Sequence, residues 1–173
     1  MKKLLVVTFI LPFMFSCGKK EGKNEQTDII EYNDQSNTSK ETQTSTDKVI
    51  NQIVIKASEN MTYDVTKFTV KAGEEITLTL VNVGTSSKEA MGHNLVILKQ
   101  GVDVNSFAFD ASSEKANDYI PANATNDIVA HTKLLGPKEN DQIKFKFDAP
   151  GTYTFICTFP GHAATMQGTI TVL

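Results

Sequence analysis

The chain has 173 residues, of which 40% are hydrophobic, and its formal net charge at pH 7 is −3. This length indicates one domain with additional segments rather than several domains. The mild negative charge, without a basic stripe, argues against nucleic acid as a partner.

The first residues have the pattern of a secretion signal. Lysines at positions 2 and 3 precede an apolar run over residues 4–15 that only Thr8 and Pro12 interrupt. A charged segment followed by an apolar one is typical of a signal peptide, and the run is shorter than the about 20 residues that a transmembrane helix needs. A buried helix is the alternative interpretation. We predict that residues 1–16 are a signal peptide and that the protein is exported, to the periplasm or the outer surface.

The predicted signal ends at Ser16-Cys17-Gly18. A small residue before a cysteine at this place resembles the bacterial lipobox, in which the cysteine becomes the lipid-bearing N-terminus, although Met14 and Phe15 depart from the residues usual there. The competing interpretation is soluble secretion, with Cys17 removed or left as a free thiol. Because an unpaired exposed cysteine is a liability in an oxidising compartment, we favour a lipid anchor at Cys17 that holds the protein to a membrane.

A polar tract follows the cysteine. Between residues 18 and 48 the only large apolar side chains are Ile29, Ile30 and Tyr32. Such a segment buries too little apolar surface to offset the entropy lost on ordering. We therefore predict that residues 17–48 are the lipidated cysteine and a disordered tether.

From about residue 49, apolar and polar residues alternate in short runs, which predicts β-strands. The runs lie around residues 53–55, 68–70, 76–81, 93–98, 143–148, 152–157 and 168–173, with turn residues between them. Short strands separated by turns are typical of an antiparallel sandwich or barrel. Between residues 104 and 117 the apolar spacing is helical instead. The predicted fold of residues 49–173 is all-β, with one short helical insertion.

The stretch from Cys157 to Met166 gathers three possible metal donors between two predicted strands. A thiol, the imidazole of His162 and a thioether are separated by few residues, with a Pro160-Gly161 turn after the cysteine. Thiolate and imidazole with a weak thioether are the donors of a blue copper site, which normally has a second histidine. His93, at the start of a distant strand, can supply it. Alternatively, a lone buried cysteine or methionine serves only for packing, but the joint spacing favours a metal site.

The motif Cys157-Thr-Phe-Pro-Gly-His162-x-x-x-Met166, together with Met91-Gly92-His93-Asn94 and the segment of residues 128–136, resembles the azurins, which are cupredoxins. The similarity covers residues 49–173. It implies a Greek-key cupredoxin β-sandwich or barrel with a helical insertion, and one type 1 copper ion per chain.

The resemblance also implies the copper ligands. His93, Cys157 and His162 would form the short trigonal set, and Met166 would be the long axial ligand. The backbone carbonyl of Gly92 would approach the copper from the opposite axial side.

Residues around the ligands have implied roles as well. Asn94 would hydrogen-bond near Thr158 and hold the two ligand-bearing segments together. Backbone amides of Asn94 and Phe159 would donate to the Cys157 sulfur and tune its electron density. His131 is interpreted as a surface histidine, because the ligand set is complete without it.

In azurins the edge of the second ligand histidine reaches the surface through an apolar patch, which implies an electron port at His162. Met91, Phe159, Pro160 and Ala163 lie beside the ligand positions in sequence, and none carries a charge. The alternative is that these residues merely close the top of the sandwich. Both roles are compatible.

These observations predict a blue copper electron-transfer protein that is not an enzyme. No Ser-His-Asp arrangement or carboxylate pair of recognisable spacing is present, and a saturated copper site leaves no position for a substrate. The expected partners are redox proteins outside the cytoplasm, such as cytochrome c, a terminal reductase or a peroxidase. Two alternatives stay open: a copper-binding or copper-delivery protein of the cell envelope, and a metal-free cupredoxin used as an interaction module. The complete ligand set disfavours both.

Overall fold

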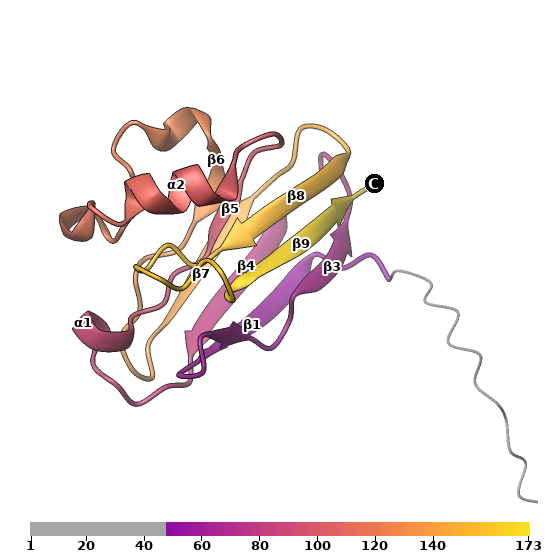
Figure 1. The fold of residues 1–173 in the computed structure, drawn as a ribbon. Helices are drawn as coiled ribbons and strands as arrows, with labels where there is room; N and C mark the ends of the chain where they lie inside the picture. Colours follow the sequence, from indigo (N-terminus) through magenta and orange to yellow (C-terminus); the bar gives the residue numbers. More distant parts are fainter. Residues whose placement is uncertain (1–47) are drawn as a thin grey trace, which may run out of the picture. The chain divides into compact units, whose positions relative to one another are not determined.

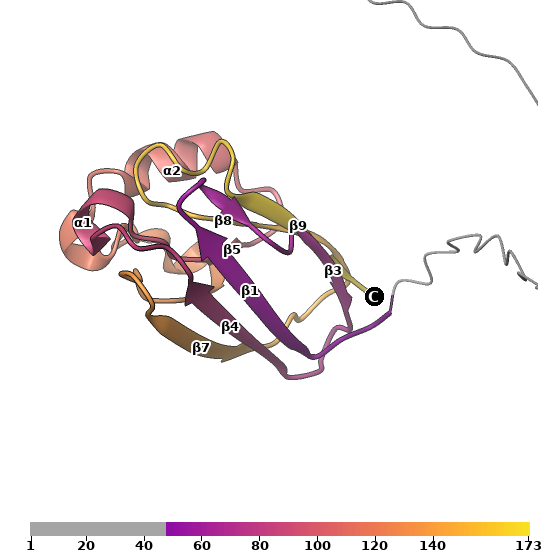
Figure 2. The ribbon, with the colours of Figure 1, turned by 90° about the horizontal axis from the view of Figure 1, so that it is seen from below.

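Two β-sheets face each other in the part of the chain that the computed structural model describes, residues 48–173 (Figure 1). The first sheet has the strand order β2 (Thr62–Tyr63), β1 (Gln52–Ser58), β4 (Ile76–Asn82), β7 (Asn140–Phe145). The second has the order β3 (Lys67–Val70), β9 (Gln167–Val172), β8 (Gly151–Ile156), β5 (Val96–Leu98), β6 (Ile128–His131). Figure 2 shows β1, β4 and β7 in one layer and β3, β9 and β8 in the other. The predicted signal peptide, Cys17 and the tether lie outside the described residues, apart from residue 48 itself.

Helical segments are few and short. Helix α1 (Lys88–Met91) leads into the predicted ligand segment. Helix α2 (Val104–Ala111) and the 3-10 turns η1 (Lys115–Asn117) and η2 (Ala124–Asn126) form one insertion between β5 and β6. None of the helices in residues 48–173 has the length and apolar character needed to cross a membrane.

Alternating side chains build the core between the sheets. On β4, Ile76, Leu78 and Leu80 point inward and have no exposed surface, while Thr77 and Thr79 between them are half-buried. Inward residues of β1, including Ile55, pack in the same cluster as Phe155 of β8 and Ile170 of β9. Each side chain of this size contributes about 1.5–3 kcal/mol when buried. This core is the rigid support of the segments that follow the strands.

The helical insertion covers the outer face of the second sheet near β5 and β8. Phe107 and Ala111 of α2 pack in one cluster with Val96, Leu98 and Ile156. This cover explains why all three residues of β5 are buried. Helix α2 starts where the Asp103 side chain accepts a hydrogen bond from the Ser106 amide, 2.8 Å long, which satisfies a free N–H of the first turn.

The predicted all-β sandwich with a short helical insertion is confirmed, with two corrections. The insertion is less helical than expected, because α2 ends at Ala111 and residues 115–117 form only a 3-10 turn. The sheets are not purely antiparallel, because β1 pairs with β4 and β3 with β9 in parallel. Alternating hydrophobicity reports which face of a strand is buried and carries no information about the direction of the neighbouring strand.

Gly168 allows β9 to lie against an aromatic stack. The Phe155 ring packs between Tyr63 and Phe68, with ring centroids 5.5 and 5.7 Å away. A Cβ atom at position 168 would overlap the Phe155 ring and lie 2.5 Å from the Thr66 carbonyl oxygen. Neither neighbour can easily move, because Phe155 is fully buried.

We expect Gly168→Ala to lower the free energy of unfolding by about 1–3 kcal/mol, since an extra methyl group in a filled core forces neighbours out of position. Urea unfolding of the metal-free protein measures this loss. Thr169→Ala, at the half-buried next position of β9, is the control and should lose less. Equal losses in the two variants would show that the close packing at Gly168 is not the cause.

Candidate metal centre

A backbone hydrogen bond between its first and last residues closes the loop of residues 157–166. It continues the β8–β9 ladder directly after the pair Ile156 and Gln167. The Cys157 amide donates to the Met166 carbonyl, with an N–O distance of 2.9 Å. The cysteine and the methionine that the sequence marks as donors are therefore neighbours across the base of the loop.

A tight turn brings the histidine of this loop back toward the cysteine. The His162 amide donates to the Phe159 carbonyl over 3.0 Å, and Gly161 has φ 82°. Pro at the second position and a positive φ at the third are the signature of a type II turn, which explains the Pro160-Gly161 pair. After this turn, Nδ1 of His162 lies 3.6 Å from Sγ of Cys157.

His93 is distant from the loop in sequence, but it lies close to Cys157 and His162. It forms an isolated antiparallel bridge with Leu135, in which the two residues exchange hydrogen bonds of 3.1 and 2.8 Å. Gly92 is buried beside it, and a Cβ atom there would lie 2.6 Å from the Lys88 carbonyl oxygen. Only glycine can lie so close to the Lys88 carbonyl of α1, and this close contact fixes the position of the next residue, His93.

The three residues form one buried cluster. One donor atom each from His93, Cys157 and His162 lies within 4.8 Å of the others, and the side chains are 0%, 0% and 3% exposed. Neither ring nitrogen of His93 forms a hydrogen bond with the described residues, although the Ser58 carbonyl lies near the ring. Buried polar atoms without partners are costly. A metal bound by two imidazoles and a thiolate would satisfy one nitrogen of the His93 ring, so the donor set fits copper.

Burial also sets the protonation states. It raises the pKa of Cys157 to about 11, against hydrogen bonds from the Asn94 and Phe159 amides and the Tyr63 hydroxyl that favour the thiolate. Burial, with the neighbouring His93, lowers the pKa of His162 to about 4, and burial lowers the pKa of His93. Both imidazoles are neutral at pH 7, as metal ligands must be, and binding a metal must release the thiol proton.

Asn94 joins the two ligand-bearing segments. Its Oδ1 accepts from the Thr158 amide over 2.9 Å, and its Nδ2 donates to Thr158 Oγ1 over 2.7 Å. The same Nδ2 donates to the Asp118 carbonyl, and the Asn94 carbonyl accepts from the Tyr63 hydroxyl over 2.5 Å. Asn94 has no exposed surface. Each of its polar side-chain atoms is therefore satisfied by a residue distant in sequence.

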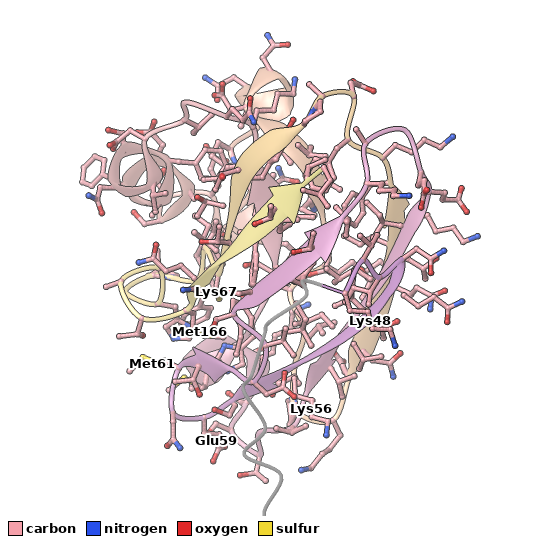
Figure 3. The ribbon with its side chains drawn as sticks, turned by 90° about the vertical axis from the view of Figure 1, so that its right-hand side faces the viewer. Lys48, Lys56, Glu59, Met61, Lys67 and Met166 are labelled. Carbon is pink, nitrogen blue, oxygen red and sulfur yellow. The ribbon has the colours of Figure 1, made fainter. Side chains whose placement is uncertain are left out.

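The remaining expected residues are also located. Met166 is fully buried, and Phe159 packs on the ring of His162 with centroids 4.6 Å apart. His131 is exposed on the edge strand β6, apart from the cluster. Figure 3 shows Met61 and Met166 at the end of the sandwich that carries the loop, where the Met61 carbonyl accepts a hydrogen bond from Thr165.

Three contributors, Tyr63, Asp118 and Tyr119, were not expected from the sequence. Tyr63 lies on the buried face of β2, where a tyrosine needs a partner for its hydroxyl. Asp118 and Tyr119 both have positive φ, 53° and 61°. Asp118 accepts from the Leu134 amide, and the Tyr119 ring packs edge-on against Phe159, 5.2 Å away. Strained backbone of this kind persists only where surrounding contacts hold it, and here it buttresses the metal centre.

Known copper proteins are similar to this chain. The family model for copper binding proteins of the plastocyanin/azurin family matches residues 49–173. Azurin-2 of Alcaligenes xylosoxydans xylosoxydans is 37% identical over 124 residues, which cover 69% of this chain and 95% of that protein. Outer membrane protein H.8 of Neisseria gonorrhoeae is 38% identical over 122 residues, 69% of this chain and 66% of that protein. The solved structure of auracyanin A, a "blue" copper protein of Chloroflexus aurantiacus, has a TM-score of 0.64 at 32% identity and covers 70% of this chain and 98% of its own.

We expect Asn94→Ala to lower the free energy of unfolding of the metal-free protein by about 1–3 kcal/mol, because the Thr158 amide is then left buried without a partner. Chemical unfolding followed by circular dichroism measures the change. Thr158→Ser, which keeps the hydroxyl acceptor, is the matched control and should lose less than Asn94→Ala. If Asn94→Ala were as stable as the wild type, the link between the ligand segments would be unimportant.

Proposed function

The chain belongs to the plastocyanin/azurin family of copper-binding proteins, and from this premise we propose that it is a type 1 blue copper protein that carries single electrons between redox partners outside the cytoplasm. The observation that carries the proposal is the buried group of two imidazoles and one thiol, with donor atoms within 4.8 Å of one another. Bound copper supplies a one-electron step between Cu(I) and Cu(II).

In this proposal His93, Cys157 and His162 would hold the copper, and Met166 and the backbone carbonyl of Gly92 would be weaker ligands. The protein's part is to hold these donors still in both oxidation states. Hydrogen bonds at the base of the loop and the bridge from His93 to Leu135 support this role. Burial keeps water and substrates from the donors, which favours electron transfer over catalysis.

Copper delivery is the alternative. A delivery protein must expose at least one ligand, so that the metal can pass to a receiving site. All four candidate side-chain donors are buried. Electron transfer, which needs only close approach of a partner, suits this burial better.

The proposed electron port is the apolar surface around His162. Pro160 is exposed, Met91 and Ala163 are half-buried, and none of them is charged. The half-buried Met61 joins this group from the β1–β2 turn. Such a surface suits brief docking, because little polar surface must lose its water and no strong ion pair slows release. The partners we propose are redox proteins such as cytochrome c, a terminal reductase or a peroxidase.

We also propose that the protein is exported and anchored to a membrane through a lipid on Cys17. The signal-like N-terminus supports export. The similarity to a protein named outer membrane protein H.8 supports a place at the cell envelope. A tether between the anchor and the copper domain would let the port meet partners at the membrane.

The oxidised copper-loaded protein should be intensely blue, because the thiolate gives a strong charge-transfer band, and Cys157→Ser should abolish the colour. An absorption spectrum after titration with Cu(II) measures both. Met166→Leu is the control, and it should stay blue because the axial ligand tunes the metal rather than holding it. A colourless wild type with stoichiometric Cu(II) would contradict electron transfer and favour copper delivery.

Met91→Lys should keep the blue spectrum and slow electron self-exchange, since two lysines would face each other in the encounter complex. The repulsion is largest at low salt, where charges are least screened. Val54→Lys adds the same charge on the exposed side of β1 and should leave the rate nearer to that of the wild type. Equal rates for Met91→Lys and the wild type at low salt would place the port elsewhere, with His131 the next site to examine.

Cys17→Ala should release the protein from the membrane fraction without changing the copper spectrum. One acyl chain alone gives only marginal binding, so a stable anchor needs the multiply acylated cysteine of a lipoprotein. Fractionation of cells followed by immunoblotting measures the change. A wild-type protein found wholly in the soluble fraction would refute the anchor and leave the copper site unaffected.

A further inference from the structure

The side chain of Glu59, in the turn between β1 and β2, holds the segment that leads to His93. Its Oε1 accepts from the Thr85 amide over 2.7 Å, from the Thr85 hydroxyl over 2.8 Å and from the Ser86 amide over 2.6 Å. These bonds, chiefly that from the Thr85 amide, lower the pKa of Glu59 to about 2, so the carboxylate is charged at pH 7. A Cβ atom at Gly84 would lie 2.8 Å from Cγ of Glu59, so glycine leaves room for this side chain. Because bonds to a charged acceptor are stronger than bonds to a neutral one, Glu59 joins the turn firmly to residues 85 and 86.

Helix α1 connects these residues to the metal centre. Ser87, next to Ser86, is the N-cap of α1, and its carbonyl accepts from the Met91 amide over 2.9 Å. Gly92 and His93 follow Met91 directly. A single helical turn therefore separates the residues that Glu59 holds from a proposed copper ligand.

The same turn also contacts the loop that carries the other donors. The Met61 carbonyl accepts from the Thr165 hydroxyl over 3.0 Å, and Thr165 precedes Met166 in the chain. Met61 has a φ of 55°, and its amide donates to the Ser58 carbonyl over 3.1 Å. A residue other than glycine keeps such a backbone only where surrounding contacts hold it. Figure 3 shows Glu59, Met61 and Met166 along one side of the molecule.

The strands on both sides of the turn are fixed. The Lys56 amide donates to Oδ1 of Asp64 over 2.7 Å, and the Asp64 amide donates to the Lys56 carbonyl over 3.1 Å. Ala57 of β1 and Tyr63 of β2 form a register pair and belong to the core of the sandwich. The turn is therefore held by a rigid hairpin and can keep its position when a contacting segment moves.

We propose that the β1–β2 turn (residues 58–61) is a second link between the two ligand-bearing segments, in addition to the Asn94 bonds, and that Glu59 is a positioning residue for His93. The inference rests on the function proposed above, in which His93 and the loop of residues 157–166 hold the copper. Glu59 acts through residues 85–92. Thr165 connects the turn to the loop.

Hydrogen exchange in the metal-free protein tests the part played by Glu59. Glu59→Ala removes the acceptor, and Glu59→Gln keeps an uncharged one. Glu74→Ala removes an equal charge from an exposed position between β3 and β4. Because local opening differs from global unfolding, we expect the His93 amide to exchange severalfold faster in Glu59→Ala, while the Leu78 amide in the middle of β4 changes less. Glu59→Gln and Glu74→Ala should stay nearer to the wild type.

Copper affinity, measured by competition with a chelator, tests the link itself. Loss of residues that orient metal ligands weakens binding, and we expect Glu59→Ala to bind Cu(II) about tenfold more weakly, with recovery in Glu59→Gln. Thr165→Val removes the contact of the turn with the loop. Because the two contacts act in series, the double variant Glu59→Ala/Thr165→Val should lose less affinity than the sum of the two single losses in free energy.

Three results overturn the proposal and leave the blue copper assignment standing. These are unchanged exchange at His93 in Glu59→Ala, equal acceleration at His93 and Leu78, and additive losses of copper affinity in the double variant. A wild type that is not blue with Cu(II) overturns the proposed function instead. The exchange experiment needs no copper, so the two failures are distinguishable.

Discussion

The hydrogen bonds of Asn94 are the constraint on which the metal centre depends. One donor, His93, precedes Asn94 directly, and the others lie in the loop that begins at Cys157, next to Thr158. Nothing in the covalent chain keeps these segments together, and the two side-chain bonds between Asn94 and Thr158 do so in a fully buried place. The donors are thus held in position by the protein itself. A site of this kind changes little between oxidation states, which suits rapid transfer of one electron.

Burial and hydrogen bonding act in opposite directions on the thiol. Loss of solvent raises the pKa of Cys157 to about 11, and this cost must be offset when the thiolate forms. The amides of Asn94 and Phe159 and the Tyr63 hydroxyl are the groups that offset it. In the proposed copper centre the same groups would withdraw electron density from the sulfur, so the features that stabilise the site would also tune its potential. The sandwich core fixes two of them, because Tyr63 and Phe159 belong to it.

The parts of the site that are local in sequence were predictable. The Pro160-Gly161 turn and the strands on either side determine how Cys157, His162 and Met166 come together, and His93 was recognisable from its motif. Contacts between residues that only tertiary packing brings together were not predictable. In the sequence, Tyr63 cannot be distinguished from other apolar strand residues, because the partner of its hydroxyl, the Asn94 carbonyl, is distant in the chain. The positive φ of Asp118 was not predictable either, because the residue is not a glycine. The parallel pairs β1–β4 and β3–β9 were missed because strand direction depends on how the chain crosses between sheets.

In the account of the site given above, the protein itself holds the donor atoms in place before copper binds. Crystal structures of the metal-free and the copper-loaded protein test this most directly. We expect the side chains of His93, Cys157 and His162 and the Asn94–Thr158 hydrogen bonds to superimpose within coordinate error in the two forms. A loop of residues 157–166 that rearranges when copper binds would contradict it, because the metal would then organise the site.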